Sequence, residues 1–502
     1  MYLPVPIFGY LCDRYGPGVP SLLSGLLFGF GYILAAFTYR SGPPQNVGGQ
    51  GWPFGIMVLA FVGIGMATSC MYLSAVTTCA KNFGRGKHKG LALALPIAAF
   101  GLSGMWQSQV GSRLLAERRQ DGSRGDVDVF RYFLFLGILL LLVGIIGLFT
   151  LRIVDEDEMI EEAVDELERS GLLDDSALFH QIAQEAGYGT MNPDQGYSAE
   201  EQAAIHQEVE LRKAQASEEQ RKKTWLLNAE TKRFLTDRTM WLLAAGFFLT
   251  TGPGEAFINN LGTIIGTFYG PETPPDAIPT SAATHVSIVA ITSTVARILT
   301  GTLSDILAPT SIPHQHRRGP NSLSNSLASL PPEAMAASFK RIQVSRILFL
   351  VVFCLLASIG QVLLASGVMQ QHAERFWIVS ATIGAGYGAI FSLVPIIISV
   401  VWGVENFGTN WGIVATVPAI GATVWGLVYS GVYQTAANRQ ISLRDLQNVF
   451  RTVEAGEDVL CHGTSCYAPT FWAMAISFWI ACAFWLWAWR GPNGWFRRGI
   501  AI

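Results

Sequence analysis

The stretch Gly9-Tyr-Leu-Cys-Asp13-Arg14-Tyr-Gly16 decides how this chain is interpreted. It closes an apolar segment at residues 1–10, so it marks the point where a membrane helix ends. A second stretch of the same kind, Gly301-Thr-Leu-Ser-Asp305, closes another apolar segment. Both place a carboxylate four residues after a glycine. The recurrence predicts that the two halves of the chain share one structural plan.

Composition indicates a membrane protein. Half of the 502 residues are apolar and 14% are charged, against about 25% charged in soluble domains; the mean hydropathy is +0.34. A membrane-spanning helix needs roughly 20 apolar residues. Such runs lie near residues 20–38, 53–80, 90–111, 131–151, 239–269, 283–307, 344–367, 376–402, 408–433 and 468–489, with 1–11 as a shortened one. We therefore expect an all-α membrane protein with about eleven transmembrane helices.

Basic residues predict the orientation. The short loop after the run at 53–80 carries four basic residues and no acid, and short basic loops remain in the cytosol. The same side should carry Arg14 and the tail at 491–502. The basic residues of the loop are Lys81, Arg85, Lys87 and Lys89.

A second repeated element supports the two-fold plan. Asn82-Phe83-Gly84 follows one apolar run, and Asn406-Phe407-Gly408 follows the corresponding run of the second half. In the second half Gly301 lies about 60 residues after the start of the preceding helix, whereas few residues precede Gly9. We therefore expect a twelve-helix protein from which roughly 50 residues are missing in this sequence. The missing residues would form the first helix, the loop after it and part of the second helix. The alternative is a protein with eleven spans.

These signals divide the chain into segments. The predicted segments are an N-terminal helical half at 1–151, a charged and largely disordered cytosolic linker at 152–237, a C-terminal half at 238–490 with a cytosolic loop at 308–343 and a non-cytosolic loop at 434–467, and a cytosolic tail at 491–502. Within the linker, Glu168 precedes Leu172 and Leu173 by four and five residues. That spacing resembles the acidic dileucine signal that sorting adaptors recognise on vacuolar cargo. A plain surface patch is the alternative.

The segment Gly252-Pro253-Gly254-Glu255-Ala-Phe-Ile-Asn259-Asn260-Leu-Gly262-Thr-Ile-Ile-Gly266, together with residues 9–16, identifies a family resemblance. It resembles the fungal monocarboxylate-transporter-homologue branch of the major facilitator superfamily, which is related to plant nodulin-like transporters. The resemblance extends from Met1 to about Trp489. It implies a fungal carrier made of two parallel helical repeats, in the vacuolar membrane or, as second choice, the plasma membrane. It assigns no substrate.

The repeated glycine–carboxylate stretch predicts a gate. We expect Asp13 to bind groups at a neighbouring cytosolic helix end and to release them when the two halves rock. A static charge cluster is the alternative, and the loop lacks the second basic cluster usual in this motif, because Gly16 is followed by Pro-Gly-Val-Pro. The predicted gating residues are Gly9, Asp13, Arg14, Gly16, Gly301 and Asp305.

Arg297 is a candidate substrate-binding residue. It lies eight residues before Asp305. Its apolar run enters the membrane near Thr284, so we place Arg297 roughly 18–20 Å into the membrane at 1.5 Å per residue. An arginine at that depth is costly unless it faces a cavity or a partner. Lactate carriers, by resemblance, place a functional arginine with three residues between it and a glycine that begins a turn, as between Arg297 and Gly301. Their aspartate one turn earlier is Ser293 here. An arginine that pairs with protein groups and holds the gate is the alternative.

Glu255 could supply the missing acid. The preceding Gly252-Pro253-Gly254 should break its helix, and broken helices in carriers mark binding sites. Burial favours the protonated form of a carboxyl group, so Glu255 is a candidate proton carrier. Asn259 and Asn260 share this region, although such polar groups can also fix helix packing. Gln107 and Tyr387 are further candidates for the transport path, with ordinary packing as the alternative.

The remaining residues argue against an enzyme. Cys461 and Cys466 fall in the non-cytosolic loop and could form a disulfide. The sequence shows no metal-ligand cluster, phosphate-binding loop or nucleophile–base pair, so we expect no metal and no cofactor. The net charge of −3 predicts no nucleic-acid partner. The expected partners are a small solute, the bilayer and sorting adaptors, and we expect a monomer.

Three functions are compatible with these features. The first is a secondary active transporter of a small polar solute, such as an organic anion or monocarboxylate with proton coupling, that works by alternating access. The second is a transporter-like membrane sensor that signals through residues 152–237. The third is an inactive truncated product.

Overall fold

The computed structural model describes residues 3–44, 48–84, 86, 88–118, 124–154, 229–269, 281–308, 343–447 and 461–502. Most of the predicted linker lies outside these residues, including Glu168, Leu172 and Leu173. The same is true of most of the predicted loop at 308–343 and of part of the loop at 434–467. Apart from residues 229–232, the described helices belong to one compact unit, which comprises residues 1–152, 233–310 and 344–502.

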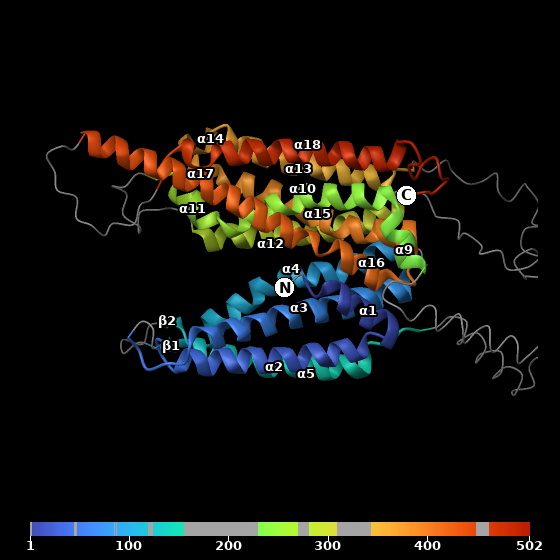
Figure 1. Ribbon diagram of the computed structural model, residues 1–502, viewed down its shortest axis with the longest axis horizontal. Coiled ribbons are helices and arrows are strands. Elements are labelled where there is room, and N and C mark those ends of the chain that lie inside the picture. Colours follow the sequence, from blue (N-terminus) through green and yellow to red (C-terminus); the bar gives the residue numbers. More distant parts are fainter. Residues whose placement is uncertain are drawn as a thin grey trace, which may run out of the picture. The chain divides into compact units, whose positions relative to one another are not determined.

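The first half of this unit is built from helices and one small ribbon. The helices are α1 (Val5–Tyr15), α2 (Gly18–Arg40), α3 (Phe54–Phe83), α4 (Lys89–Leu114) and α5 (Val129–Thr150). Between α4 and α5, strands β1 (Ala116–Arg118) and β2 (Arg124–Val127) pair antiparallel. Helix α2 packs against α3 and α5, and α3 also packs against α1 and α4 (Figure 1).

The second half begins with α9 (Ala229–Thr236). It continues with α10 (Arg238–Asn259), α11 (Leu261–Gly266), α12 (Ala282–Leu307), α13 (Arg346–Ala365), α14 (Val368–Gln371), a 3₁₀ turn (Ala373–Arg375), α15 (Phe376–Trp402), α16 (Phe407–Val414), α17 (Val417–Gln447), a second 3₁₀ turn (Thr464–Cys466) and α18 (Ala468–Arg490). Helix α15 packs against α12 and α13, and α10 packs against α17 and α18. The two halves meet where α1 contacts α16 and where α4 contacts α12 (Figure 1).

The helical membrane architecture expected from the sequence is confirmed. Within the described part of the chain, nine helical segments are long and apolar enough to cross a membrane. Helix α10 is not among them because Gly252, Pro253 and Glu255 lower its hydropathy, although it is buried among α15, α17 and α18. Helix α17 continues to Gln447, so part of the segment predicted as a loop at 434–467 is helical.

The predicted break at Gly252-Pro253-Gly254 is wrong. Helix α10 runs through these residues, and the chain breaks only at Asn260, before α11. Proline at 253 cannot donate to the carbonyl of Leu249. That carbonyl instead accepts a hydrogen bond of 2.8 Å from the Ser477 hydroxyl of α18. A neighbouring helix thus satisfies the backbone group that the proline frees, as membrane helices require.

Small residues bring α2 and α5 into backbone contact. A Cβ atom at Gly144 would lie 2.5 Å from the Cα of Gly25, and one at Gly25 would lie 2.9 Å from the Cα of Gly144. The Ser21 hydroxyl adds a hydrogen bond of 3.3 Å to the Gly144 carbonyl. Close approach of backbones at small residues is how membrane helices gain packing energy without a hydrophobic driving force.

We expect Gly144→Ala to lower the free energy of unfolding of the detergent-solubilised protein by about 1–3 kcal/mol, because the added methyl group would collide with the backbone of α2. The apparent melting temperature should fall accordingly. The matched control is Gly426→Ala, since a Cβ at Gly426 meets nothing within 4 Å. The control should leave the apparent melting temperature unchanged or raise it. Equal melting temperatures for the two variants would contradict close α2–α5 packing.

Residues 491–502 pack against the helices of the second half. Trp495 and Ile502 are buried, and the Trp495 ring meets Trp402 edge-on at 6.0 Å. The Arg346 amide donates to the Ile502 carbonyl. The segment that the sequence predicted as a tail is therefore folded onto the bundle.

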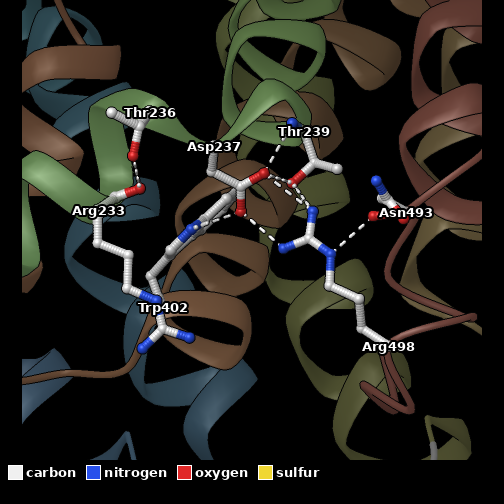
Figure 2. A network of polar contacts seen from close by, with 7 residues as sticks. All are labelled: Arg233, Thr236, Asp237, Thr239, Trp402, Asn493 and Arg498. Atoms are coloured by element: carbon white, nitrogen blue, oxygen red, sulfur yellow. Dashed lines mark hydrogen bonds and ion pairs between the residues drawn. The ribbon is translucent and has the colours of Figure 1, made fainter.

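One ion pair anchors this segment. Figure 2 shows the Arg498 guanidinium facing the Asp237 carboxylate, with two hydrogen bonds of 2.7 and 2.9 Å. Asp237 also accepts from the Thr239 amide and so caps α10. Burial by itself would raise the pKa of Asp237, but the hydrogen bonds from Arg498 and Thr239 outweigh it and hold this pKa below its ordinary value.

Because the pKa of Asp237 is lowered in the folded protein, the stabilisation by this ion pair should decrease in acid. The ion pair contributes its full stabilisation above the unfolded pKa of about 3.9 and loses it as the pH falls through the lower folded value. We expect Asp237→Asn to lower the free energy of unfolding by about 1 kcal/mol at pH 7. The difference from wild type should begin to shrink below about pH 4. Thermal unfolding between pH 7 and 3.5 measures this, with exposed Glu230→Gln as the control. A constant difference at all pH values would contradict the assignment.

Candidate transport site and gate

Asp13 binds the N-terminus of a helix in the other half of the protein. Its carboxylate accepts from the Thr409 amide at 2.7 Å, the Thr409 hydroxyl at 2.8 Å and the Gly408 amide at 3.3 Å, all at the start of α16. Lys81, at the end of α3, pairs with it at 2.9 Å. The first amides of a helix have no partner within the helix and carry partial positive charge. They therefore form a good binding site for this buried carboxylate.

Asp305 makes the equivalent contact in the opposite direction. It lies near the end of α12 and accepts from the Gly90 and Leu91 amides of α4, at 2.7 and 2.8 Å. Lys89 and Arg346 supply the positive charges near it. Each half thus holds the first amides of a helix in the other half with one carboxylate. We call the end of the bundle that contains Asp13 and Asp305 the gate end.

Glycines allow these contacts to form. A Cβ at Gly9 would lie 2.0 Å from the Gly408 carbonyl oxygen, and a Cβ at Gly301 would lie 2.7 Å from the Gly90 carbonyl oxygen. Neither position accepts a side chain while the helices are this close. Gly16 has a different role, because its φ of 77° ends α1 in a conformation that favours glycine.

Arg14 points away from the gate contacts. It is exposed, donates to the Tyr10 hydroxyl at 2.7 Å and lies over the Tyr15 ring. The residue that neutralises Asp13 is Lys81, which the sequence indicated only as a marker of orientation. Its position directly before Asn82-Phe83-Gly84 was the available signal.

Arg297 lies at the interface between the halves. It is 4% exposed on α12, and its Nη1 donates to the Ile97 carbonyl of α4 at 2.6 Å. A Cβ at Gly101, one turn further along α4, would lie 2.3 Å from that nitrogen. Its guanidinium also lies 5.9 Å from the centre of the Phe391 ring of α15. Arg297 therefore contacts both halves at once.

Glu255 is held by the same helix, α15. The Tyr387 hydroxyl donates to Glu255 Oε1 at 2.5 Å. The rings of Tyr387 and Phe391, one turn apart, lie 4.8 Å from each other. Glu255, Tyr387, Phe391 and Arg297 thus form a connected cluster from α10, α15 and α12, which we call the polar–aromatic cluster.

The family comparison agrees with this geometry. The family model described as Major Facilitator Superfamily matches residues 3–426. The chain belongs to the major facilitator superfamily. As a member of that superfamily it is a multi-pass membrane transporter.

Relatives within the superfamily are similar over the whole chain. "Probable transporter mch1" of Aspergillus fumigatus is 55% identical and that of Neurospora crassa is 53% identical; each match covers 100% of this chain and 79% and 82% of the relative, respectively. A crystal structure of a double-tryptophan mutant of XylE has a TM-score of 0.50 at 12% identity, with 97% of this chain and 82% of that one covered. This last likeness concerns the fold alone.

The structure also places the other predicted site residues of this superfamily member. Asn259 is exposed at the end of α10, and the Asn260 side chain donates to the Ala256 carbonyl of its own helix. Gln107 is half-buried on α4. Asn260 therefore caps a helix. The sequence did not single out Phe391 and Gly101, which the structure places next to Arg297.

The end of the bundle opposite the gate end carries a disulfide. Cys461 and Cys466 are joined, as the sequence suggested they could be. The Gly463 amide between them donates to the Thr267 carbonyl after α11, and Gln440 of α17 both donates to the His462 carbonyl and accepts from its amide. This segment connects α11 to α17.

We expect Asp13→Asn to open the gate end of this transporter, because it leaves Lys81 buried without its counter-charge. The readout is alkylation of a cysteine placed at buried Thr77, beside Gly408, in a Cys79→Ser background. Alkylation should become at least about tenfold faster. Arg14→Gln, which removes a charge at the neighbouring exposed residue, is the control. If both variants react at the wild-type rate, Asp13 does not hold the gate.

Proposed function

We propose that this transporter is a proton-coupled secondary carrier of small organic anions, such as monocarboxylates, that works by alternating access. The polar–aromatic cluster carries this proposal, because it brings a buried cation and an acid to neighbouring turns of one helix, α15.

We further propose that the transporter is located in the vacuolar membrane. The acidic dileucine spacing at Glu168, Leu172 and Leu173 supports this location.

Arg297 is proposed to bind the anion. Its guanidinium is buried, remains charged and presents several donors in one plane, which suits a carboxylate. In this structure Nη1 donates to the Ile97 carbonyl of the opposite half. A substrate carboxylate is a stronger acceptor than a backbone carbonyl. Anion binding would therefore loosen a contact between the halves, and this links substrate binding to the rocking motion.

Glu255 is proposed to carry the proton. Its carboxyl group accepts from the Tyr387 hydroxyl, so Tyr387 holds it in place on the cluster. The Tyr387 ring fits because the neighbouring α10 residue is Gly254, where a Cβ would lie 2.5 Å from the ring. A proton on Glu255 would offset the charge of the bound anion in a region from which water is largely excluded.

The gate supplies the alternation. The contacts of Asp13 and Asp305 close the gate end, and their release would open it, as rigid halves rock about a central site. Each contact joins a carboxylate to helix amides, so it can break and re-form without any covalent change. The proposed cycle therefore needs no cofactor.

The test uses purified protein in liposomes that contain a pH-sensitive dye, with a panel of monocarboxylates added outside. Wild type should move protons with the accepted solute. Glu255→Gln should abolish this proton movement while it retains exchange of labelled solute, because the amide keeps a hydrogen-bond acceptor for Tyr387 but cannot release a proton. The matched control is Glu374→Gln, since Glu374 is largely exposed.

Two results would contradict the proposal. Proton movement by Glu255→Gln at the wild-type rate would remove Glu255 as the proton carrier. Solute exchange that survives Arg297→Gln at the wild-type rate would remove Arg297 as the anion site.

A further inference from the structure

Asp237 joins three separate segments at the gate end. Its carboxylate accepts from Arg498 of the segment 491–502, from the Thr239 amide at the start of α10 and from the Trp402 indole N–H at the end of α15, at 3.3 Å (Figure 2). The Arg498 guanidinium is itself held by the Asn493 carbonyl and the Thr239 hydroxyl. The Arg498 guanidinium is thus fixed by two contacts in addition to the Asp237 carboxylate.

Trp402 is enclosed by aromatic rings on two sides. Phe234 meets its ring edge-on at 5.0 Å, and Trp495 meets it edge-on at 6.0 Å. Phe234 and Trp495 are both fully buried. The end of α15 is therefore fixed by residues 491–502 both through Arg498 and through Trp495.

A short turn connects Trp402 to the gate helix α16. The turn consists of residues 403–406 and starts at Gly403, whose φ is 85°. The Phe407 amide donates back to the Val404 carbonyl, and the Asn410 amide donates to the Asn406 carbonyl. These hydrogen bonds restrict the conformation of the short turn. The position of Trp402 therefore determines the position of the Gly408 and Thr409 amides that Asp13 binds.

The turn also contacts the first half directly. A Cβ at Gly84 would lie 2.5 Å from the Val404 side chain, so Val404 packs closely on the end of α3. Lys81, which neutralises Asp13, lies in the last turn of the same helix. The turn therefore contacts the same helix end that supplies the counter-charge of Asp13.

We infer that residues 491–502 form a strap that positions the start of α16 for Asp13, with Arg498 as its positioning residue and Asp237 and Trp402 as the residues through which it acts. The strap favours the state in which the gate end is closed. Loss of the strap should raise the open population even though Asp13 and Lys81 themselves are unchanged. This inference rests on the proposed alternating access, because it concerns the same gate.

The test measures the opening of the gate end without any solute. Spin labels are placed at Phe83 of α3 and Ile306 of α12, which are exposed at the gate end in opposite halves. The protein is used at full length in a Cys79→Ser background, and the distance distribution is recorded by double electron–electron resonance. Asp13→Asn serves as the reference for an opened gate.

We expect Arg498→Ala to raise the open fraction about threefold to tenfold, in the same direction as Asp13→Asn. Arg497→Ala removes the same charge from the neighbouring exposed position and should match wild type. Arg498→Lys should give an intermediate value, since lysine keeps the charge but not the two parallel hydrogen bonds. Trp402→Phe keeps an aromatic ring beside Phe234 and Trp495 but removes the N–H donor and part of the ring surface, and should shift the distribution in the same direction by less.

The outcomes separate the strap from the proposed transport function. If Asp13→Asn opens the gate while Arg498→Ala and Trp402→Phe both match wild type, the strap is overturned. If Asp13→Asn leaves the distances unchanged, the gate is overturned and the strap with it. Failure of every tested solute to be transported, with Arg498→Ala still opening the gate, would overturn the proposed substrate and support the strap.

Discussion

A carboxylate bound to the first amides of a helix in the opposite half is the interaction on which this structure depends. It occurs twice, as Asp13 with α16 and as Asp305 with α4. Burial of an ionised carboxylate is costly unless hydrogen bonds and opposite charge replace its water. Helix amides together with Lys81 supply this at Asp13. The interaction is strong while the halves are together, and water can replace it when they separate, which suits a gate.

The close approach of the halves also determines what lies between them. Arg297 reaches the Ile97 carbonyl because α12 and α4 are close enough at Gly301 and Gly90 for the Asp305 contact to form. Glu255 lies on α10, and it is joined to Arg297 through Tyr387 and Phe391. The proposed anion site therefore depends directly on the close approach of α12 and α4 at the gate contact.

The fold and the gate carboxylates were predictable from sequence, and much of the site was not. Asp13 and Asp305 recur in a short repeated stretch, and the apolar runs are long, so both signals are local. The partners of Asp13 are distant in sequence, and nothing near Thr409 indicates which carboxylate it binds. The break expected at Pro253 is absent because Ser477 satisfies the freed carbonyl of Leu249, a contact between distant helices. The sequence did not single out Phe391 and Gly101, because they contact Arg297 only through the packing of helices that are distant in sequence.

We propose that the two carboxylate contacts act as one gate, so that neither opens without the other. Hydrogen–deuterium exchange at the first amides of α16 and α4 can be compared between wild type and Asp13→Asn in the absence of solute. If the contacts open together, the substitution speeds exchange at Gly408 and Thr409 and also at Gly90 and Leu91, although no atom near Asp305 has changed. Faster exchange at the start of α16 with unchanged exchange at the start of α4 would show that the two contacts are independent and that they do not form one gate.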